Sequence, residues 1–240
     1  MDFLSRSELL IGKIGLEKLK NAHILVIGLG GVGSYAAEAL ARAGVGKMTI
    51  VDGDTVVQSN INRQLQALHS TISLSKSYLM ARRIQDINPE IILTEINQFL
   101  MPEDMQKLIT SEFAFVLDCI DSITPKINII TTCKQKKIKF ISSMGAGGKT
   151  DPSLIKITDI YHTRDCFFSR DVRKRLRKLN YNHGIKVVYS DEVVSKDKME
   201  LTDGTLFKKS YYGTISYMPA MFGLTMASYV IRKLIHAHEV

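Results

Sequence analysis

The sequence predicts an α/β protein built on a Rossmann-like, doubly wound, mainly parallel sheet that carries a C-terminal extension. Three observations lead to this fold class. Short apolar runs alternate with helix-like segments over the first 150 residues. The first apolar run breaks into a cluster of glycines that opens a helix-like segment. Aspartates follow two later runs, at the edge where open parallel sheets bind their ligands.

The glycine cluster lies between two predicted elements near the amino terminus. Residues 4–19 predict one or two short helices, His23–Ile27 a buried strand, and Ser34–Ala43 an alanine-rich helix. The intervening glycines are Gly28, Gly30, Gly31 and Gly33. Glycines let the backbone turn tightly and come close to a phosphate, and the free amides of the following helix favour negative charge. We therefore expect a nucleotide at this turn.

A second strand, Met48–Val51, ends at Asp52, nineteen residues after Gly33. Nucleotide-binding folds place a carboxylate here for a ribose hydroxyl. The block that follows adds cationic and amide donors, namely Asn60, Arg63, Gln64 and Lys76. Such a cluster suits a triphosphate, whereas the pyrophosphate of a nicotinamide or flavin dinucleotide does not need it. Taken alone, Lys76 is compatible with a surface lysine and Arg63 with a loop ion pair.

The apolar run Phe113–Leu117 predicts another buried strand and delivers two aspartates to the same edge of the sheet. Asp121 is suited to hold a magnesium ion that bridges phosphates, with Asp118 as a supporting or capping residue. Asp121-Ser122 is also compatible with an N-cap of the next helix, and the two roles do not exclude each other.

The remaining elements follow from apolar runs and breaker residues. We expect strands at Ile91–Ile96, Lys139–Ser143 and Val187–Ser190, helices at Ser75–Ile87, Pro102–Ile109, Ile123–Lys136, Arg164–Asn180 and Pro219–His236, and a polar loop at Asp191–Lys209. The alternation weakens after Asp151-Pro152. We therefore expect a nucleotide-binding scaffold in residues 1–150 and an extension in residues 151–240 that belongs to the same domain.

Five blocks in this order carry a resemblance to a known family. They are Gly28-x-Gly-Gly-x-Gly33, Asp52-x-Asp54, Ser59-Asn60-x-Asn-Arg63-Gln64, Lys76 and Asp118-x-x-Asp121. The combination resembles the ATP-dependent adenylating family that includes the ubiquitin-activating enzymes and the molybdopterin and thiamine sulfur-carrier adenylyltransferases. Linked blocks are far more specific than a single glycine loop.

The resemblance implies ATP and Mg²⁺ as cofactors and an acyl-adenylate intermediate. It implies that the ATP site is formed by the glycines of the loop together with Asp52, Asp54, Asn60, Arg63, Gln64 and Lys76. It also implies catalytic roles for Arg63, Lys76 and Asp121, with Asp121 as the metal ligand. In this family an arginine near the amino terminus reaches into the partner's site, so the resemblance implies a homodimer with Arg6 in that role. A solvated arginine on an amphipathic helix is the alternative for Arg6.

Three further stretches are similar to the tRNA threonylcarbamoyladenosine dehydratases, a branch of this family. These are Ser59–Ser70, Ile141–Lys149 followed by Asp151-Pro152, and the basic run Arg170–Lys178. This similarity implies ATP-dependent cyclisation of a modified adenosine beside the anticodon of tRNA. It also implies that the basic helix contacts tRNA phosphates through Arg170, Arg173, Arg175 and Arg177. A solvated helix face is the alternative for this run.

The composition fits a globular protein with an anionic partner. The net charge is +8 and 45% of the residues are apolar. The three cysteines form no CxxC pair, which indicates neither a disulfide framework nor a structural zinc site and favours a reducing cytoplasm. The start of the chain lacks a signal-peptide core, and the apolar segment Ile215–Ile231 contains polar residues and Pro219. We therefore expect a buried helix there and no membrane partner.

Other functions remain open at this point. A sulfur-carrier adenylyltransferase would share the first half reaction, although that branch commonly carries CxxC zinc pairs, which are missing here. A nicotinamide-dependent oxidoreductase would make Arg63 and Lys76 structural. A non-catalytic tRNA- or partner-binding module would keep only the fold. A sulfur-transfer protein is a further candidate partner, and Cys166 is the one cysteine that merits a test for reactivity.

Overall fold

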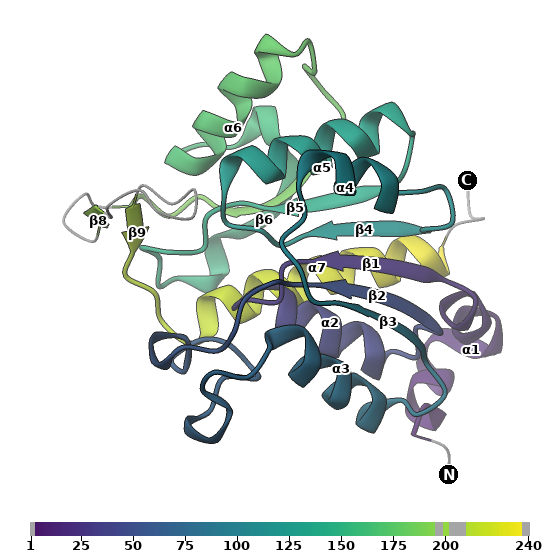
Figure 1. Ribbon diagram of the computed structural model, residues 1–240. Helices are drawn as coiled ribbons and strands as arrows, with labels where there is room; N and C mark the ends of the chain where they lie inside the picture. Colours follow the sequence, from purple (N-terminus) through teal and green to yellow (C-terminus); the bar gives the residue numbers. More distant parts are fainter. Residues whose placement is uncertain (1–2, 195–198, 202–209, 237–240) are drawn as a thin grey trace.

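The computed structural model describes residues 3–194, 199–201 and 210–236 (Figure 1). Its centre is a seven-stranded sheet in the order β3-β2-β1-β4-β5-β7-β6. The strands are β1 (His23–Ile27), β2 (Lys47–Val51), β3 (Ile92–Ile96), β4 (Phe115–Asp118), β5 (Phe140–Ser143), β6 (Ile155–Asp159) and β7 (Lys186–Ser190). All neighbours pair in parallel except β6 and β7, which are antiparallel. The predicted mainly parallel α/β fold is confirmed.

Helices cover both faces of the sheet (Figure 1). One face carries α1 (Ser5–Lys20), α2 (Gly33–Arg42), α3 (Lys76–Ile87) and α7 (Tyr217–Ile235), and the other carries α4 (Pro102–Leu108), α5 (Ile123–Gln135) and α6 (Phe167–Lys178). Alternate strand residues face opposite layers: Ile24 and Val26 pack toward α2, and Leu25 and Ile27 pack toward α5. Burial on both faces explains why the central strands are apolar runs without alternation.

The strand order places two loops side by side at the carboxyl edge. The chain moves from β1 to β2 and β3 on one side, and then returns to β4 on the other side of β1. Ligands of open α/β sheets bind where the order reverses in this way. The glycine loop after β1 therefore lies beside the turn after β4. A Cβ on Gly28 would approach the carbonyl oxygen of Cys119 to 3.2 Å, so the two loops are in contact.

Helix α7 packs against the glycine loop and supports it. Helix α7 packs against α2, and Gly223 allows the closest approach, since a Cβ there would overlap the carbonyl oxygen of Val32. A Cβ on Gly31 would lie 2.9 Å from Cβ of Pro219. The apolar segment that contains Pro219 is a helix, as expected, but it is buried on one face only, because Met221 and Leu224 on the other face are exposed. The described residues contain no helix that is both long and apolar enough to cross a membrane.

The extension differs from expectation in two places. Strand β6 was not predicted, because it is a short edge strand that is only half-buried and its alternation spans five residues. The predicted polar loop contains β8 (Met199–Leu201), which pairs with β9 (Ser210–Tyr212), while its residues 195–198 and 202–209 lie outside the described residues. Helix α6 is shorter than predicted and begins at Phe167, since Asp165 has a positive φ of 46°. The division at residue 150 stays a prediction, and both β6 and β7 join the sheet.

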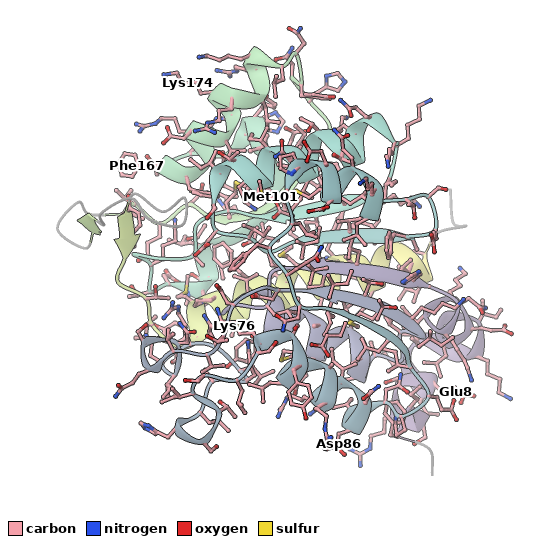
Figure 2. All side chains as sticks on the ribbon, in the orientation of Figure 1. Glu8, Lys76, Asp86, Met101, Phe167 and Lys174 are labelled. Atoms are coloured by element: carbon pink, nitrogen blue, oxygen red, sulfur yellow. The ribbon has the colours of Figure 1, made fainter. Side chains whose placement is uncertain are left out.

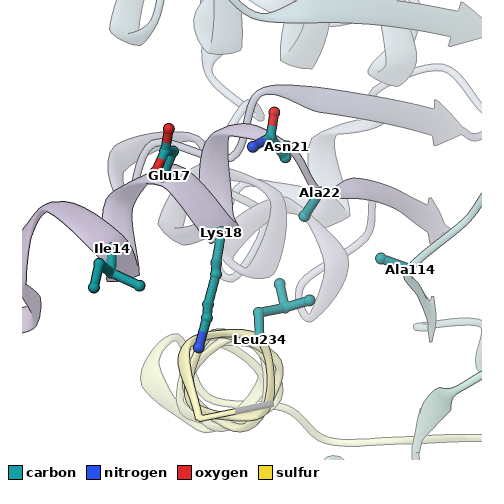
Figure 3. A pocket seen from close by; sticks show the side chains of 7 residues that line it. All are labelled: Ile14, Glu17, Lys18, Asn21, Ala22, Ala114 and Leu234. Atoms are coloured by element: carbon teal, nitrogen blue, oxygen red, sulfur yellow. The ribbon is translucent and has the colours of Figure 1, made fainter. Parts of the chain in front are cut away.

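The described residues also contain four short 3₁₀ helices: η1 (Gln58–Asn60), η2 (His69–Thr71), η3 (Pro152–Leu154) and η4 (Ile160–His162). Helix α1 lies at the opposite, amino edge of the sheet and is kinked at Gly12. Beside it, a hollow of about 360 Å³ lies between α1, the start of β4 and α7 (Figure 3). The hollow is lined by Lys18 and Leu234 among others, and Lys18 donates to the carbonyl of Ile235. It lies away from the edge where the sequence predicts a nucleotide.

Candidate functional site

The glycine loop is held in shape by Asp52. Leu29 donates its amide to Asp52 Oδ2 at 2.6 Å, and Asp54 donates its amide to Asp52 Oδ1 at 2.8 Å. Burial raises the pKa of Asp52, and the charge of Lys76 opposes that rise. Asp52 therefore lies at the predicted ribose position and also fastens the loop after β1 to the end of β2.

The loop leaves open space where side chains would otherwise intrude. Gly28 has a φ of +89°, and a Cβ on Gly33 would overlap the carbonyl oxygen of Gly28. Only glycine fits either position without a shift of the backbone. Helix α2 begins at Gly33, so the positive end of its dipole lies at the loop, where the amide of Ser34 donates to the carbonyl of Gly30. This is the geometry of a phosphate site.

Gln64 lies over the loop. A Cβ on Gly30 would lie 3.7 Å from Gln64 Nε2, and Gln66 donates to the carbonyl of Leu29 at 2.7 Å. The side chain of Gln64 is buried, yet its Oε1 finds no hydrogen-bond partner within the described residues. A buried acceptor without a partner is costly unless a bound molecule supplies a donor. The cradle therefore fits a nucleotide.

Lys76 lies at the first position of α3 and is only 5% exposed. Its Nζ forms an ion pair with Asp54 Oδ2 at 2.8 Å, and its amide donates to the carbonyl of Asp54. The predicted pair Asp54 and Lys76 is thus in direct contact, between the end of β2 and the start of α3 (Figure 2 labels Lys76). The solvated surface lysine is excluded by this burial.

Arg63 lies beside the glycine loop, since a Cβ on Gly31 would come within 3.4 Å of Arg63 Cγ, and its charge interacts with the carboxylate of Asp121. Its Nη1 donates to the carbonyl of Ser59 at 2.7 Å and to Asn62 Oδ1 at 2.8 Å. Burial lowers the pKa of the Arg63 guanidinium, and the carboxylate of Asp121 partly offsets this. Asn60 is buried and its Oδ1 accepts the amide of Val57, which holds the turn that carries Arg63. The predicted donors therefore converge on the space between the glycine loop and Asp121.

Asp121 follows β4 in an exposed turn, and Ser122 is the N-cap of α5 without a side-chain cap bond. Ser122 thus occupies the N-cap position without capping the helix through its own side chain. No group of three or more His, Cys, Asp or Glu gathers in the part of the chain that is described. Magnesium commonly binds through one or two carboxylates plus substrate phosphates, so Asp121 beside a triphosphate fits such an ion.

Asp118 was expected at this edge, but its two side-chain partners, Lys126 and Ser142, were not found by sequence reasoning. Asp118 is fully buried, and its Oδ2 lies 2.6 Å from Lys126 Nζ and 2.6 Å from Ser142 Oγ. The helical spacing could have revealed that Lys126 is buried, because Lys126 shares a face of α5 with Ile130 and Cys133, which are buried. A lysine on such a face requires a buried anionic partner. Asp118 supports the turn rather than facing solvent.

A family model described as the ThiF family matches residues 4–240. The chain belongs to the ThiF family. It is 41% identical over 243 residues to the tRNA threonylcarbamoyladenosine dehydratase of Bacillus subtilis, with 98% of this chain and 96% of that protein covered. The molybdopterin-synthase adenylyltransferase of Salmonella typhimurium is 39% identical over 130 residues, which cover 53% of this chain and 51% of that protein.

A solved structure is similar over the same length. The E. coli tRNA N6-threonylcarbamoyladenosine dehydratase in complex with ATP has a TM-score of 0.88 and 33% identity, with 98% of this chain and 95% of that chain covered. The resemblance to an ATP-dependent adenylating family is therefore confirmed. The similarity to the dehydratases includes the C-terminal extension, whereas the match to the adenylyltransferase covers about half of the chain.

Within this ThiF-family chain, α6 presents the predicted basic surface. It buries Ser169, Val172 and Leu176 and exposes most of its cations (Figure 2 labels Phe167 and Lys174). Arg170 lies over the ring of Phe167, and Arg177 lies over the ring of Tyr161. The exposed arginines stay available for an anionic partner.

Arg173 and Arg175 differ from these two. Arg173 donates to the carbonyls of Ile160 and Thr163 and to the hydroxyl of Thr163, so it ties α6 to η4. A contact between Arg173 and a tRNA phosphate, as predicted, would require these internal hydrogen bonds to break. Arg175 donates to Thr124 Oγ1 at 3.0 Å, which brings the helix against the start of α5, three residues after Asp121. The basic surface therefore adjoins the candidate ATP site.

The cysteines give this chain of the ThiF family no evident nucleophile. All three are free and buried. Burial raises the pKa of Cys119, and it raises the pKa of Cys133 to about 12, so both stay protonated thiols at neutral pH. Cys166 caps α6 and its Sγ accepts the amide of Ser169 at 3.5 Å.

Arg6 is exposed on α1, and this helix lies at the amino edge of the sheet (Figure 1). A Cβ on Gly44, in the turn before β2, would lie 2.8 Å from Cδ1 of Leu4, which fixes that end of α1 beside the amino ends of the strands. Arg6 therefore does not approach the ATP site of its own chain. The other predicted site residues cluster at the carboxyl edge.

Proposed function

We propose that the protein is an ATP-dependent tRNA threonylcarbamoyladenosine dehydratase that cyclises the modified adenosine beside the anticodon. One observation carries this proposal: similarity to a dehydratase covers 98% of the chain, including the basic helix of the extension. The similarity to a molybdopterin-synthase adenylyltransferase covers only 53%. The described edge of the sheet supplies a phosphate cradle beside a basic surface, which an enzyme for ATP and tRNA needs.

The proposed chemistry has two steps. The threonyl carboxylate of the modified base attacks the α-phosphorus of ATP, a P–O bond forms, and pyrophosphate leaves with the electrons of the broken P–O bond. The carbamoyl group of the same substrate then attacks the acyl carbon, closes the ring and expels AMP. Net loss of one water accompanies cleavage of ATP to AMP and pyrophosphate. The second nucleophile is tethered, so no enzyme thiol is required.

The residues at the carboxyl edge have distinct roles in this proposal. Arg63 and Lys76 stabilise the negative charge that develops on the phosphates during attack. Asp52 holds the ribose, and the glycine loop and α2 hold phosphate through backbone amides. Asp121 is the residue that would hold Mg²⁺. When bound, that ion neutralises charge on the triphosphate.

We propose that tRNA lies along α6 with its anticodon stem facing the edge of the sheet. Arg175 joins α6 to Thr124, next to the turn of Asp121, so a base held against this helix comes close to the phosphates. Phosphate contacts from exposed arginines are the usual source of affinity for RNA. Arg170, Arg175 and Arg177 are the candidates, and Arg173 contributes by holding the helix in place.

We also propose a homodimer in which Arg6 completes the partner's site. Leu9 and Leu10 follow Arg6 on α1 and are 89% and 85% exposed. Large apolar side chains exposed together favour a protein interface. Arg6 lies at the edge opposite to its own ATP site, so an arginine in that role must come from another chain. A cytoplasmic location and a sulfur-transfer protein partner remain part of the proposal.

The test is nucleotide consumption with matched substrates. The protein with ATP and Mg²⁺ is given tRNA that carries threonylcarbamoyladenosine, the same tRNA without the modification, or a sulfur-carrier protein. We expect AMP and pyrophosphate only with the modified tRNA, together with a nucleoside that has lost one water by mass spectrometry. AMP formation with the sulfur-carrier protein instead would favour the adenylyltransferase, and no ATP consumption would contradict both.

A further inference from the structure

A charged pair is enclosed between β4, β5 and α5, and the proposed chemistry does not use it. Lys126 Nζ lies 2.6 Å from Asp118 Oδ2, and both side chains are 0% exposed. Ser142 Oγ closes the triangle, at 3.0 Å from Lys126 Nζ and 2.6 Å from Asp118 Oδ2. The ring of Phe168 in α6 lies 5.8 Å from the ammonium. Every charged atom of the pair therefore has a fixed partner.

Stability alone does not explain such a pair. Removing two charges from water costs much of what their attraction returns, and an apolar pair of similar volume is often as stable or more stable. A buried ion pair does fix orientation, because each group has one low-energy arrangement. The ion pair therefore orients a neighbouring part of the chain.

The second oxygen of Asp118 contacts the segment that the ion pair orients. Asp118 Oδ1 accepts the amide of Ile120 at 3.2 Å, inside the turn that leads to Asp121. A carboxylate is planar, so fixing Oδ2 with Lys126 and Ser142 also fixes the direction of Oδ1. The amide of Cys119 is held by the carbonyl of Ile27 at 2.9 Å. Two successive amides of the turn are thus held, one by β1 and one by Asp118.

We propose that Lys126 is a positioning residue for the adenylation site. Through Asp118 it fixes the turn of residues 118–121, and so it sets the place of the Asp121 carboxylate opposite Arg63. This inference rests on the proposed role of Asp121 at the phosphates and metal. Residues that orient a metal ligand typically alter metal affinity or activity by about 10- to 100-fold when they are removed.

The test compares binding of ATP with and without Mg²⁺ by calorimetry. In Lys126→Met we expect ATP affinity without the metal to stay within about threefold of wild type, since the glycine loop is untouched. The gain in affinity on adding Mg²⁺ should fall about tenfold or more, and half-maximal AMP formation should need at least about tenfold more Mg²⁺. An unchanged effect of Mg²⁺ on ATP binding would overturn the proposal.

Two further variants keep the test decisive if Lys126→Met does not fold. The double variant Lys126→Met with Asp118→Leu carries no buried charge and is expected to fold. It also removes the acceptor of Ile120, so it should lose the effect of Mg²⁺ while melting near wild type. Lys126→Arg retains a charged donor and should restore most of the effect. A double variant with a wild-type response to Mg²⁺ would refute the positioning role.

A matched control separates positioning from general destabilisation. Lys149 is also a buried lysine, and among the described residues its Nζ donates to the backbone carbonyls of Ser190 and Glu192 and to no carboxylate. Lys149→Met should lower the melting temperature yet leave the response of ATP binding to Mg²⁺ within about twofold. If wild type forms no AMP with modified tRNA, the proposed function fails, while the calorimetric comparison still tests Lys126.

Discussion

Lys76 Nζ and Asp54 Oδ2 lie 2.8 Å apart at the junction of β2 and α3, with the lysine nearly enclosed and the aspartate half-exposed. An ammonium at the first position of a helix is unfavourable beside the positive end of the dipole. Asp54 offsets that cost in the absence of nucleotide. A triphosphate bound at the glycine loop would place more negative charge near Lys76 Nζ than Asp54 does. Lys76 could then exchange its contact with Asp54 for a contact with a phosphate.

We therefore expect Lys76→Ala to reduce AMP formation with modified tRNA about a hundredfold or more, because a charge at the phosphates is lost. Single-turnover measurement with saturating ATP checks this. Lys20→Ala is the control, since Lys20 forms an exposed pair with Glu90 and should leave the rate within about twofold. Near-normal turnover in Lys76→Ala would remove it from the site.

Arg63→Ala should show a loss of similar size, about a hundredfold, because the guanidinium stabilises charge that develops during attack on phosphorus. Asp121→Ala should also abolish product formation with the fold intact. Arg42→Ala is matched to Arg63→Ala, since Arg42 is exposed on α2 and paired with Glu38. Circular dichroism and AMP formation are measured on the same samples, and full activity of either site variant would contradict the assignment.

Mixing two inactive variants tests action in trans. Arg6→Ala and Asp121→Ala should each be inactive, and a mixed dimer should regain one site with both residues intact. We expect recovery of up to about a quarter of wild-type activity from random exchange. Subunit exchange is verified with differently tagged chains. No recovery after proven exchange would place Arg6 outside the partner's site.

The basic surface of α6 is tested by salt dependence. Replacing Arg170 and Arg175 with Ser should weaken tRNA binding and lower the salt slope by roughly one unit per lost contact. ATP affinity should not change. The double variant Lys107→Ser with Lys137→Ser removes the same charge from exposed positions on other elements and is the control. Unchanged slopes in the α6 variant would exclude this helix from tRNA binding.

Arg173→Ser should behave differently from its neighbours. Its guanidinium holds three oxygens of η4 and Thr163, so its loss should lower the melting temperature more than the loss of Arg170. Thermal melting of the two single variants checks this. Equal melting temperatures with a reduced salt slope would make Arg173 a tRNA contact as first predicted.

The raised pKa values of the Cys119 and Cys133 thiols predict that neither of these two cysteines is a nucleophile in the reaction. Cys133, whose pKa is about 12, stays protonated across the neutral range and cannot form a thioester readily. Cys119→Ala and Cys133→Ala should therefore keep AMP formation within about threefold, apart from modest losses of stability. Mass spectrometry of trapped intermediates should find no covalent adduct on either thiol.

The sequence predicts the fold well where one rule dominates. Strands such as His23–Ile27 and Phe115–Asp118 are buried on both faces, so an unbroken apolar run identifies them. Strand β6 was not predicted, because an edge strand that is half-exposed to solvent has no unbroken apolar run. Asp52 was predicted from its spacing after the glycines and Asp54 from the family resemblance, and the structure brings both together with Lys76.

Sequence reasoning fails where a residue acts through a partner distant in the chain. Lys126 pairs with Asp118 eight positions away and with Ser142 on the next strand, and no local motif contains all three. Likewise, the run Arg170–Lys178 does not reveal that Arg173 turns inward, because this depends on the carbonyls of η4. Spacing predicts which residues share a surface, whereas three-dimensional contacts decide what each one holds.

The position of α7 has a consequence for biosynthesis. Pro219 and Gly223 pack against the glycine loop and the start of α2, so the helix that supports this loop is synthesised after the loop itself and after β2, α3 and β4. Strand β7, which lies between β5 and β6, also comes late. A nascent chain therefore carries the glycine loop before the helix that packs against it has been made.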